Sequence, residues 1–230
     1  MSTRWVPGPR RAPFEAEGTE EQLRRRLDEA GIREKRVRDA MRRVRRHEFV
    51  RPDYSDQAYE NCPLPIGEGQ TISQPFVVAL MTEALRINPG DRVLEVGTGS
   101  GYQAAVLAEM GAVVWSVEII PSLAEWAREN LVRAGYPQVN LRTGDGYFGW
   151  EEHSPYDAIV VTAAPDHVPQ ALVDQLAVGG RLVMPVGPSG YYQTLWLMER
   201  TQDGVSSRNL GPVSFVPFTG AGVKAGMDWD

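Results

Sequence analysis

Residues Arg92–Gly101, RVLEVGTGSG, and the nearby stretch Val113–Glu118, VVWSVE, decide the fold of this 230-residue chain. The first stretch predicts a buried strand followed by a glycine turn that opens a helix, and the second predicts another strand, which ends in an acid. A glycine turn at a helix start, with an acid at the end of the next strand, is typical of a nucleotide site in a parallel α/β sheet.

The spacing of the glycines argues against a dinucleotide. A dinucleotide fold has the pattern G-x-G-x-x-G, with the pyrophosphate at the helix start. Here the glycines are Gly97, Gly99 and Gly101, and Tyr102 stands where the third dinucleotide glycine would be. Glu95 lies just before the turn, where its charge would oppose a pyrophosphate and favour a cationic ligand.

The pattern E-x-G-x-G-x-G resembles motif I of the class I S-adenosyl-L-methionine-dependent methyltransferases, whose ligand carries a sulfonium and an ammonium group. Glu118 suits the ribose of such a ligand, because a carboxylate at a strand end can accept two hydrogen bonds from a cis diol. The two acids and the glycine turn therefore predict a nucleoside site.

The composition is that of a globular protein. Hydrophobic residues make up 42% and charged residues 23% of the chain, and no apolar run approaches the roughly 20 residues that span a bilayer. The start, MSTRWVPGPRRAP, does not read as a secretory signal. We therefore expect a cytoplasmic protein that does not contact membranes.

Cysteine and histidine usage gives no metal signature. Cys62 is the single cysteine, which fits a reducing compartment, and the three histidines are scattered (His47, His153 and His167). We expect no metal site.

The net charge of −6 hides an asymmetry. Residues 20–51 carry twelve basic and seven acidic side chains, a balance of +5, which leaves −11 for the remainder. Such an arginine-rich segment can indicate a nucleic-acid interface. We favour amphipathic helices with solvated, internally paired charges, because apolar residues recur at helical spacing and no aromatic residues interleave with the arginines.

The order of predicted elements indicates a Rossmann-like, doubly wound, mostly parallel sheet with an N-terminal helical extension. We expect a disordered start (1–18), a helical extension with an active-site loop (19–75), a ligand-binding domain (76–219) and a tail (220–230). Helical patterns run to about Arg51, where Pro52 ends the second helix. A long loop then reaches Pro75, and such loops are usually functional.

After a helix at Phe76–Leu85, strands and helices alternate from Arg92 onward. Ser122 and Glu125 predict a capping box for the helix that reaches Ala134. The predicted strands are Val93–Val96, Val113–Glu118, Val139–Thr143, Tyr156–Thr162, Arg181–Pro185, Thr194–Met198 and Val213–Val216, and the predicted helices of this part are Phe76–Leu85, Tyr102–Met110, 122–134 and Val168–Leu176.

Ligands of open parallel sheets bind at the carboxyl ends of the strands. The glycine turn, the residues after Glu118, Gly144-Asp145-Gly146 and Thr162-Ala163-Ala164 should meet there. Asp145 between two glycines is either a ligand contact near an adenine amino group or an ordinary Asp-Gly turn, and its position after a strand favours the ligand contact.

Several motifs resemble the protein-L-isoaspartate (D-aspartate) O-methyltransferases in order and spacing, from about Val37 to Thr219. They are YENCPLPIGEGQTISQPFVVALMTEAL, VLEVGTGSGYQ, VWSVE, GDG, YDAIVVTAAP, GGRLVMPVG and VSFVPFTG. Gly69–Pro75, GQTISQP, is the most specific of them. The resemblance implies repair of damaged proteins: S-adenosyl-L-methionine methylates the free carboxyl of L-isoaspartyl and D-aspartyl residues, leaving S-adenosyl-L-homocysteine, and the ester collapses to a succinimide.

The resemblance also implies roles for individual residues. Ser73 matches the family's active-site serine, which orients a carboxylate that is already ionised at pH 7, so no strong base is required. A serine that caps the next helix is the alternative. The implied cofactor contacts are Thr71, Ile72, Ser73, Glu95, Gly97, Gly99, Gly101, Glu118, Asp145, Gly146 and Thr219. The implied partners are isoaspartyl proteins and peptides. We also expect a monomer that binds no nucleic acid.

Other functions stay open. A relative could methylate normal aspartate in a dedicated peptide, an RNA methyltransferase could use the arginines, or a cofactor-binding protein could have lost catalysis. Thr162-Ala163-Ala164-Pro165 stands where exocyclic-amine methyltransferases have Asn/Asp-Pro-Pro-Tyr/Phe. A hydrolase triad with Asp166-His167 is disfavoured, because the sequence has no G-x-S-x-G elbow.

Overall fold

The computed structural model describes residues 16–188 and 192–225. Most of the predicted disordered start and the last five residues of the predicted tail lie outside these ranges. In the described part of the chain, none of the helices is long and apolar enough to cross a membrane.

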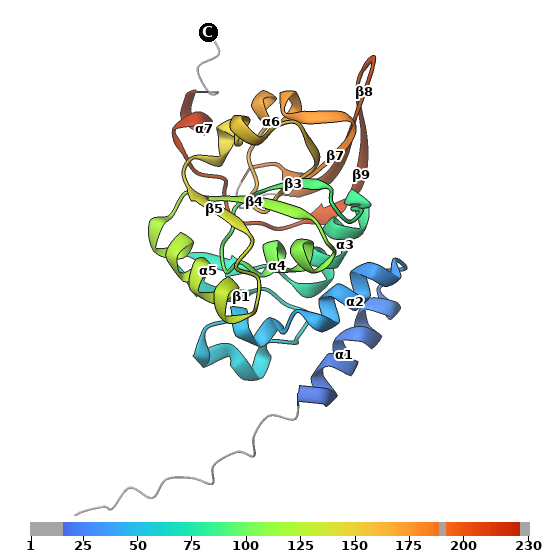
Figure 1. Ribbon diagram of the computed structural model, residues 1–230, viewed down its shortest axis with the longest axis vertical. Helices are drawn as coiled ribbons and strands as arrows, with labels where there is room; N and C mark the ends of the chain where they lie inside the picture. The colour runs from blue at the N-terminus through green and yellow to red at the C-terminus, as the bar shows by residue number, and fades with distance from the viewer. Residues whose placement is uncertain (1–15, 189–191, 226–230) are drawn as a thin grey trace, which may run out of the picture.

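A seven-stranded sheet forms the centre of the molecule (Figure 1). Its strand order is β5-β4-β3-β6-β7-β8-β9, in which β5 to β7 are parallel and β8 and β9 are antiparallel to their neighbours. The mostly parallel, Rossmann-like prediction is confirmed. The strands are β3 (Arg92–Val96), β4 (Val113–Glu118), β5 (Asn140–Thr143), β6 (Tyr156–Val161), β7 (Leu176–Val186), β8 (Gln193–Thr201) and β9 (Gly204–Val213).

Each face of the sheet buries its own core, because successive side chains of a strand point to opposite faces. Val93 of β3 packs in the core beneath the larger group of helices, whereas the next residue, Leu94, packs in the core under α6 and α7. Figure 1 shows the two groups on opposite sides of the sheet. The helices are α1 (Ala16–Glu29), α2 (Lys35–Arg43), α3 (Pro75–Leu85), α4 (Tyr102–Glu109), α5 (Pro121–Arg133), α6 (Gln170–Asp174) and α7 (Ala221–Ala225).

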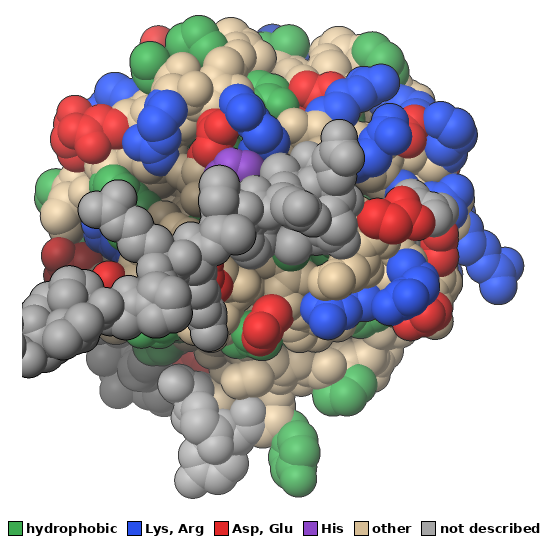
Figure 2. Space-filling model, turned by 90° about the horizontal axis from the view of Figure 1, so that it is seen from below, with side chains coloured by type: hydrophobic (Ala, Val, Ile, Leu, Met, Phe, Trp, Pro, Cys, Tyr) green, Lys and Arg blue, Asp and Glu red, His purple; other side chains and the backbone are tan. Residues whose placement is uncertain are grey.

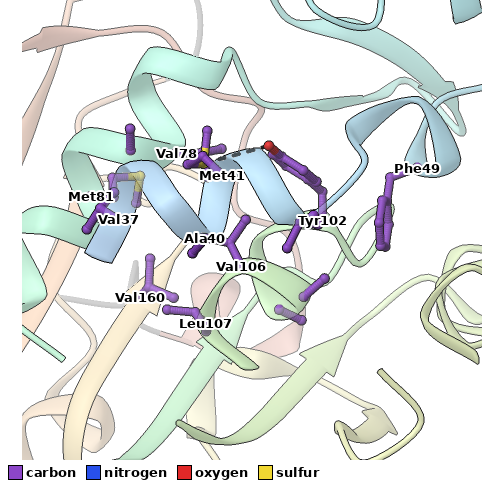
Figure 3. Packing of buried hydrophobic residues seen from close by; sticks show 14 of the residues in the cluster. Val37, Ala40, Met41, Phe49, Val78, Met81, Tyr102, Val106, Leu107 and Val160 are labelled. Carbon is purple, nitrogen blue, oxygen red and sulfur yellow. Dashed lines mark hydrogen bonds between the residues drawn. The ribbon is translucent and has the colours of Figure 1, made fainter. Parts of the chain in front are cut away.

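The N-terminal helices dock on α3 and α4. Figure 3 shows Val37, Ala40 and Met41 of α2 beside Tyr102 and Val106 of α4, all of them buried. Polar contacts reinforce the docking, because the Arg36 guanidinium donates to the Ile87 and Met110 carbonyls at 2.8 and 2.9 Å, just beyond the last turns of α3 and α4. One side chain of α2 thereby ties together the segments that follow α3 and α4.

The arginines of this extension are largely paired. Figure 2 shows acidic side chains interspersed among the Lys and Arg on the face seen from below. Ion pairs join Arg43 to Glu109 at 3.1 Å and Arg45 to Glu48 at 2.7 Å, and Arg38 also pairs with Asp28. This arrangement supports the interpretation of a solvated, internally neutralised surface.

Three local predictions were wrong. The second helix does not reach Pro52 but ends at Arg43, and two short 3-10 helices follow, Arg46–Phe49 and Pro52–Gln57. The last strand is Gly204–Val213 and not Val213–Val216, because an edge strand with a polar exposed side does not show an apolar run.

The third wrong prediction is the capping box of Ser122 and Glu125. The α5 helix starts at Pro121 after Ile120, which provides no side-chain cap, and Ser122 bonds to Glu68 instead. The predicted long loop also contains a separate hairpin of β1 (Leu64–Gly67) and β2 (Gln70–Ile72).

Candidate active site

A cavity of about 780 Å³, including its open mouth, lies at the carboxyl edge of the parallel strands. The ends of β3, β4 and β6 and the β1–β2 hairpin all contribute to its wall. The lining residues are Gln70, Thr71, Ile72, Ser73, Val78, Val96, Gly97, Thr98, Gly99, Ser100, Tyr102, Gln103, Val117, Glu118, Ile119, Ile120, Gly146, Thr162, Ala163, Val216, Pro217, Phe218 and Thr219.

The glycine turn forms the floor of the cavity. Gly97 and Gly99 have φ values of +97° and +55°, which only glycine adopts without strain. A Cβ atom on Gly97 would lie 2.4 Å from the hydroxyl oxygen of Thr162, which donates a 2.6 Å hydrogen bond to the Gly97 carbonyl. Gly101 serves a different purpose. It is not in the wall, and a Cβ atom there would meet Leu131 of α5 at 3.1 Å.

Glu118 faces the cavity from the end of β4. Its carboxylate accepts hydrogen bonds from the Gly99 amide at 2.8 Å and from the Ile120 amide at 3.0 Å, so it joins the glycine turn to the start of α5. A carboxylate has about four lone-pair sites, so Glu118 retains capacity for ribose hydroxyls.

The charge of the wall matches a cationic ligand. Among the described residues that line the cavity, Glu118 is the one carboxylic acid, and none is Lys, Arg or His. A phosphate-bearing dinucleotide would find no compensating cation there, whereas a sulfonium and an ammonium group would be favoured. The residues present therefore fit S-adenosyl-L-methionine.

Glu95 does not reach the cavity. Its side chain is fully buried and accepts a hydrogen bond from Ser116, and the charge of Glu118 acts on it. Burial raises the pKa of Glu95 to about 8, the Ser116 hydrogen bond lowers it in part, and the charge of Glu118 raises it further. Ser116 also bonds to Thr98 of the glycine turn at 2.5 Å. Glu95 thus supports the turn from behind.

Asp145 also lies outside the wall. Its two carboxylate oxygens accept hydrogen bonds from the Tyr147 and Gly222 amides, each at 3.0 Å. Gly222 belongs to α7, so Asp145 ties the turn after β5 to the C-terminal segment. The neighbouring Gly146 and Thr219 do line the cavity.

Thr71, Ile72 and Ser73 all line the cavity, and two of them also line a second, larger groove of about 1430 Å³. Thr71, Ser73, Thr162 and Val216 are common to both walls, so the two spaces meet there. The rest of the groove is mainly apolar: Pro63, Gln74, Phe76, Val77, Leu80, Leu210, Gly211, Pro212, Val213, Ser214 and Phe215.

Some wall residues were not predicted. Tyr102 and Gln103, on the first turn of α4, look like ordinary helix residues in the sequence, and only the packing of α4 turns them inward. Phe218 stands in the quoted motif VSFVPFTG beside Thr219 and could have been included. His167 lines neither the cavity nor the groove, and its two ring nitrogens bond to Tyr147 and Asp166 at 2.9 and 2.6 Å.

In the described ranges, no group of three or more His, Cys, Asp or Glu side chains is placed to hold a metal ion.

Comparisons with known proteins agree with this geometry. Residues 18–222 match the family model described as protein-L-isoaspartate(D-aspartate) O-methyltransferase. A protein-L-isoaspartate O-methyltransferase of Gloeobacter violaceus is 56% identical over 200 residues, covering 87% of this chain and 96% of the relative. A protein-L-isoaspartate O-methyltransferase 2 of Polaromonas is 56% identical over 188 residues, covering 81% of this chain and 89% of the relative.

A solved structure shows the same likeness in three dimensions. It comes from Plasmodium falciparum, is described as a protein-L-isoaspartate O-methyltransferase and was solved in complex with S-adenosyl-L-homocysteine. Its TM-score is 0.76 at 28% identity, over 87% of this chain and 98% of that chain. Because the family model matches nearly all of the described residues and the Gloeobacter relative is 56% identical, this chain belongs to the protein-L-isoaspartate (D-aspartate) O-methyltransferase family.

Proposed function

We propose that this chain transfers a methyl group from S-adenosyl-L-methionine to the free carboxyl of L-isoaspartyl and D-aspartyl residues in damaged proteins and peptides. The observation that carries the proposal is the junction of the two spaces at Thr71, Ser73 and Thr162. The smaller cavity, whose charge favours a cation, suits the methyl donor, and the larger, mainly apolar groove beside it suits a residue within a polypeptide.

The donor occupies the cavity over the glycine turn. Glu118 binds the ribose hydroxyls with its remaining lone pairs, and Gly97 and Gly99 allow close approach of the methionine part. Gly146, Phe218 and Thr219 form the adenine side, while Asp145 holds that side in place through Gly222. In this proposal Glu95 and Gly101 support the glycine turn and do not contact the donor.

The acceptor occupies the groove. Three residues of α3 give the groove an apolar side: Phe76, Val77 and Leu80. The segment 210–216 also lines it, with Pro212, Val213 and Phe215 as apolar members. An apolar, weakly featured wall tolerates many neighbouring side chains, which is what repair of diverse proteins requires. The isoaspartyl carboxylate then reaches the junction at Ser73.

The main catalytic task of the protein is to align the methyl donor with the acceptor carboxylate. When bound, S-adenosyl-L-methionine supplies an electrophilic methyl carbon: the new O–CH3 bond forms as the S–CH3 bond breaks, and the sulfur keeps the electron pair. Ser73 donates a hydrogen bond that orients the attacking carboxylate, and Thr71 and Ile72 close the wall against water. Such alignment can supply up to roughly 7–11 kcal/mol of the barrier reduction.

We further propose a cytoplasmic monomer that acts on proteins and peptides without nucleic acid. The single cysteine and the internally paired arginines of the N-terminal helices support this proposal. Sedimentation of the purified protein tests its oligomeric state.

The deciding experiment uses a labelled methyl donor and paired synthetic peptides that differ only in isoaspartate or aspartate at one position. We expect base-labile methyl ester on the isoaspartyl peptide alone. Ester on the aspartyl peptide would indicate a dedicated-peptide enzyme. Label on neither peptide would overturn the proposal and direct the search to RNA substrates.

A further inference from the structure

The β1–β2 hairpin forms one wall of the cavity but is not part of the main sheet. It carries Gln70, Thr71 and Ile72, and Ser73 follows directly. No backbone ladder links it to β3 or β4, so side-chain contacts determine how firmly it lies over the cavity.

The tip of the hairpin is strained. Gly67, Glu68 and Gly69 have φ values of +97°, +54° and +70°, so a non-glycine residue adopts the left-handed region between two glycines. Such a conformation persists only where surrounding contacts hold it. Two contacts do so here.

The first contact is between the Glu68 carboxylate and Ser122 of α5, whose hydroxyl donates a 2.8 Å hydrogen bond. The second involves Arg51, which donates to the Ile66 carbonyl at 2.7 Å and stacks its guanidinium 3.9 Å from the ring centre of Trp126, also on α5. A Cβ atom on Gly67 would come within 3.3 Å of Arg51, so the hairpin backbone lies directly against this side chain.

The helix that receives both contacts, α5, begins directly after residues that line the cavity. The residues just before α5, Glu118 to Ile120, also line the cavity, and the Ile120 amide bonds to Glu118. A link from the hairpin to α5 therefore joins the wall that holds the ribose to the wall that holds the acceptor serine.

We infer that Arg51, Trp126, Glu68 and Ser122 form a latch that holds the β1–β2 hairpin closed over the nucleoside and sets how fast it leaves. The inference rests on the proposed function for the identity of the nucleoside. These four are positioning residues: none of them lines the cavity, and they act through the hairpin that does.

The first test measures dissociation of S-adenosyl-L-homocysteine by stopped flow and amide hydrogen exchange of residues 70–72 in the ligand-free protein. We expect Arg51→Met to raise both rates about ten-fold, since the variant loses both the hydrogen bond to the Ile66 carbonyl and the stacking on Trp126. Arg128→Met is the matched control, because Arg128 is an arginine of α5 and, within the described ranges, its ion pair is with Glu125 of the same helix. It should change neither rate.

A second set of variants tests the latch through exposed residues that cannot unfold the core. Glu68→Ala and Ser122→Ala should each raise the dissociation rate two- to three-fold, the double variant should do no more than either, and Glu68→Gln should retain the wild-type rate. Wild-type rates in Arg51→Met, Glu68→Ala and Ser122→Ala would overturn the latch. If the wild-type protein bound no S-adenosyl-L-homocysteine, the proposed function would fail, and hydrogen exchange alone would still decide the latch.

Discussion

At the scale of single residues, the two acids beside the glycine turn have opposite surroundings. Glu118 lies in the cavity wall and accepts hydrogen bonds from two backbone amides, whereas Glu95 is buried behind the turn and burial raises its pKa to about 8. Near neutral pH, Glu95 is therefore mostly a neutral carboxylic acid. It can then hold the Ser116–Thr98 contact without adding a second negative charge beside Glu118.

This difference predicts a pH-dependent stability. Glu95 loses its proton near 4.5 in the unfolded chain and near 8 in the folded one, so its contribution is fully present below pH 4.5 and is lost as the pH rises through 8. Glu95→Gln should remove that loss. In urea denaturation its free energy of unfolding should exceed that of the wild type by on the order of 2–4 kcal/mol at pH 8.5, and by little at pH 5.

The exposed Glu129→Gln on α5 is the control and should follow the wild-type pH profile. If Glu95→Gln ran parallel to the wild type across this range, the buried acid would be ionised in the folded protein and the assignment would be wrong.

Ser73 provides the second residue-scale prediction. Because its hydroxyl is placed to orient an ionised carboxylate, Ser73→Ala should lower kcat/KM for an isoaspartyl peptide roughly ten- to hundred-fold, as expected for a hydrogen bond to a charged group. Affinity for S-adenosyl-L-homocysteine, measured by calorimetry, should change less than about two-fold. Ser214→Ala, in the groove but outside the cavity, is the matched control. Equal kcat/KM values in the two variants would exclude Ser73 from the mechanism.

At the scale of elements, the alternation of apolar strands and helices from Arg92 to Val186 could be predicted because buried parallel strands are nearly continuous apolar runs. Other elements carry no such local signal. β9 is polar on its exposed edge, and the hairpin is too short to show a period. Ser122 was predicted to cap α5 from its local spacing to Glu125. Its actual partner, Glu68, lies 54 positions away in the sequence and reaches it only in the folded protein.

The same reasoning applies to the acids at the strand ends. Their positions in the sequence are local and predictable, but whether the side chain of Glu95 or Asp145 points into the cavity depends on packing against distant parts of the chain. Gly222 lies 77 positions from Asp145 and bonds to it.

Asp145 therefore supports an element-scale prediction. Asp145→Ala removes the acceptor of the Gly222 amide and loosens α7, so the exchange rate of that amide should rise at least roughly ten-fold, for a bond worth on the order of 1.5–3 kcal/mol. Cofactor affinity should fall a few-fold, since Thr219 lies in the wall. Asp174→Ala on α6 is the control. Unchanged exchange at Gly222 would show that α7 is held by its apolar contacts alone, chiefly Val223.

At the scale of the whole molecule, the arginine-rich helices are a structural part of the enzyme and not an appended module. Val37, Ala40 and Met41 of α2 share one core with α3, α4 and the sheet (Figure 3). Arg36 and Glu83 add polar ties, since the Glu83 carboxylate accepts the Arg33 and Glu34 amides at 2.7 and 2.6 Å at the start of α2. The charge asymmetry of the sequence cannot distinguish such docking from a nucleic-acid arm, because pairing partners such as Glu109 lie far along the chain.

Shared packing predicts a single cooperative unfolding transition. Arg36→Met removes two donors from carbonyls beyond α3 and α4 and should lower the free energy of unfolding by about 1–3 kcal/mol, while calorimetry still shows one transition. Arg42→Met, an exposed arginine 4.0 Å from Asp39, should change stability by less than about 0.5 kcal/mol. Two separate transitions in Arg36→Met would show that the N-terminal helices α1 and α2 unfold independently of the central sheet.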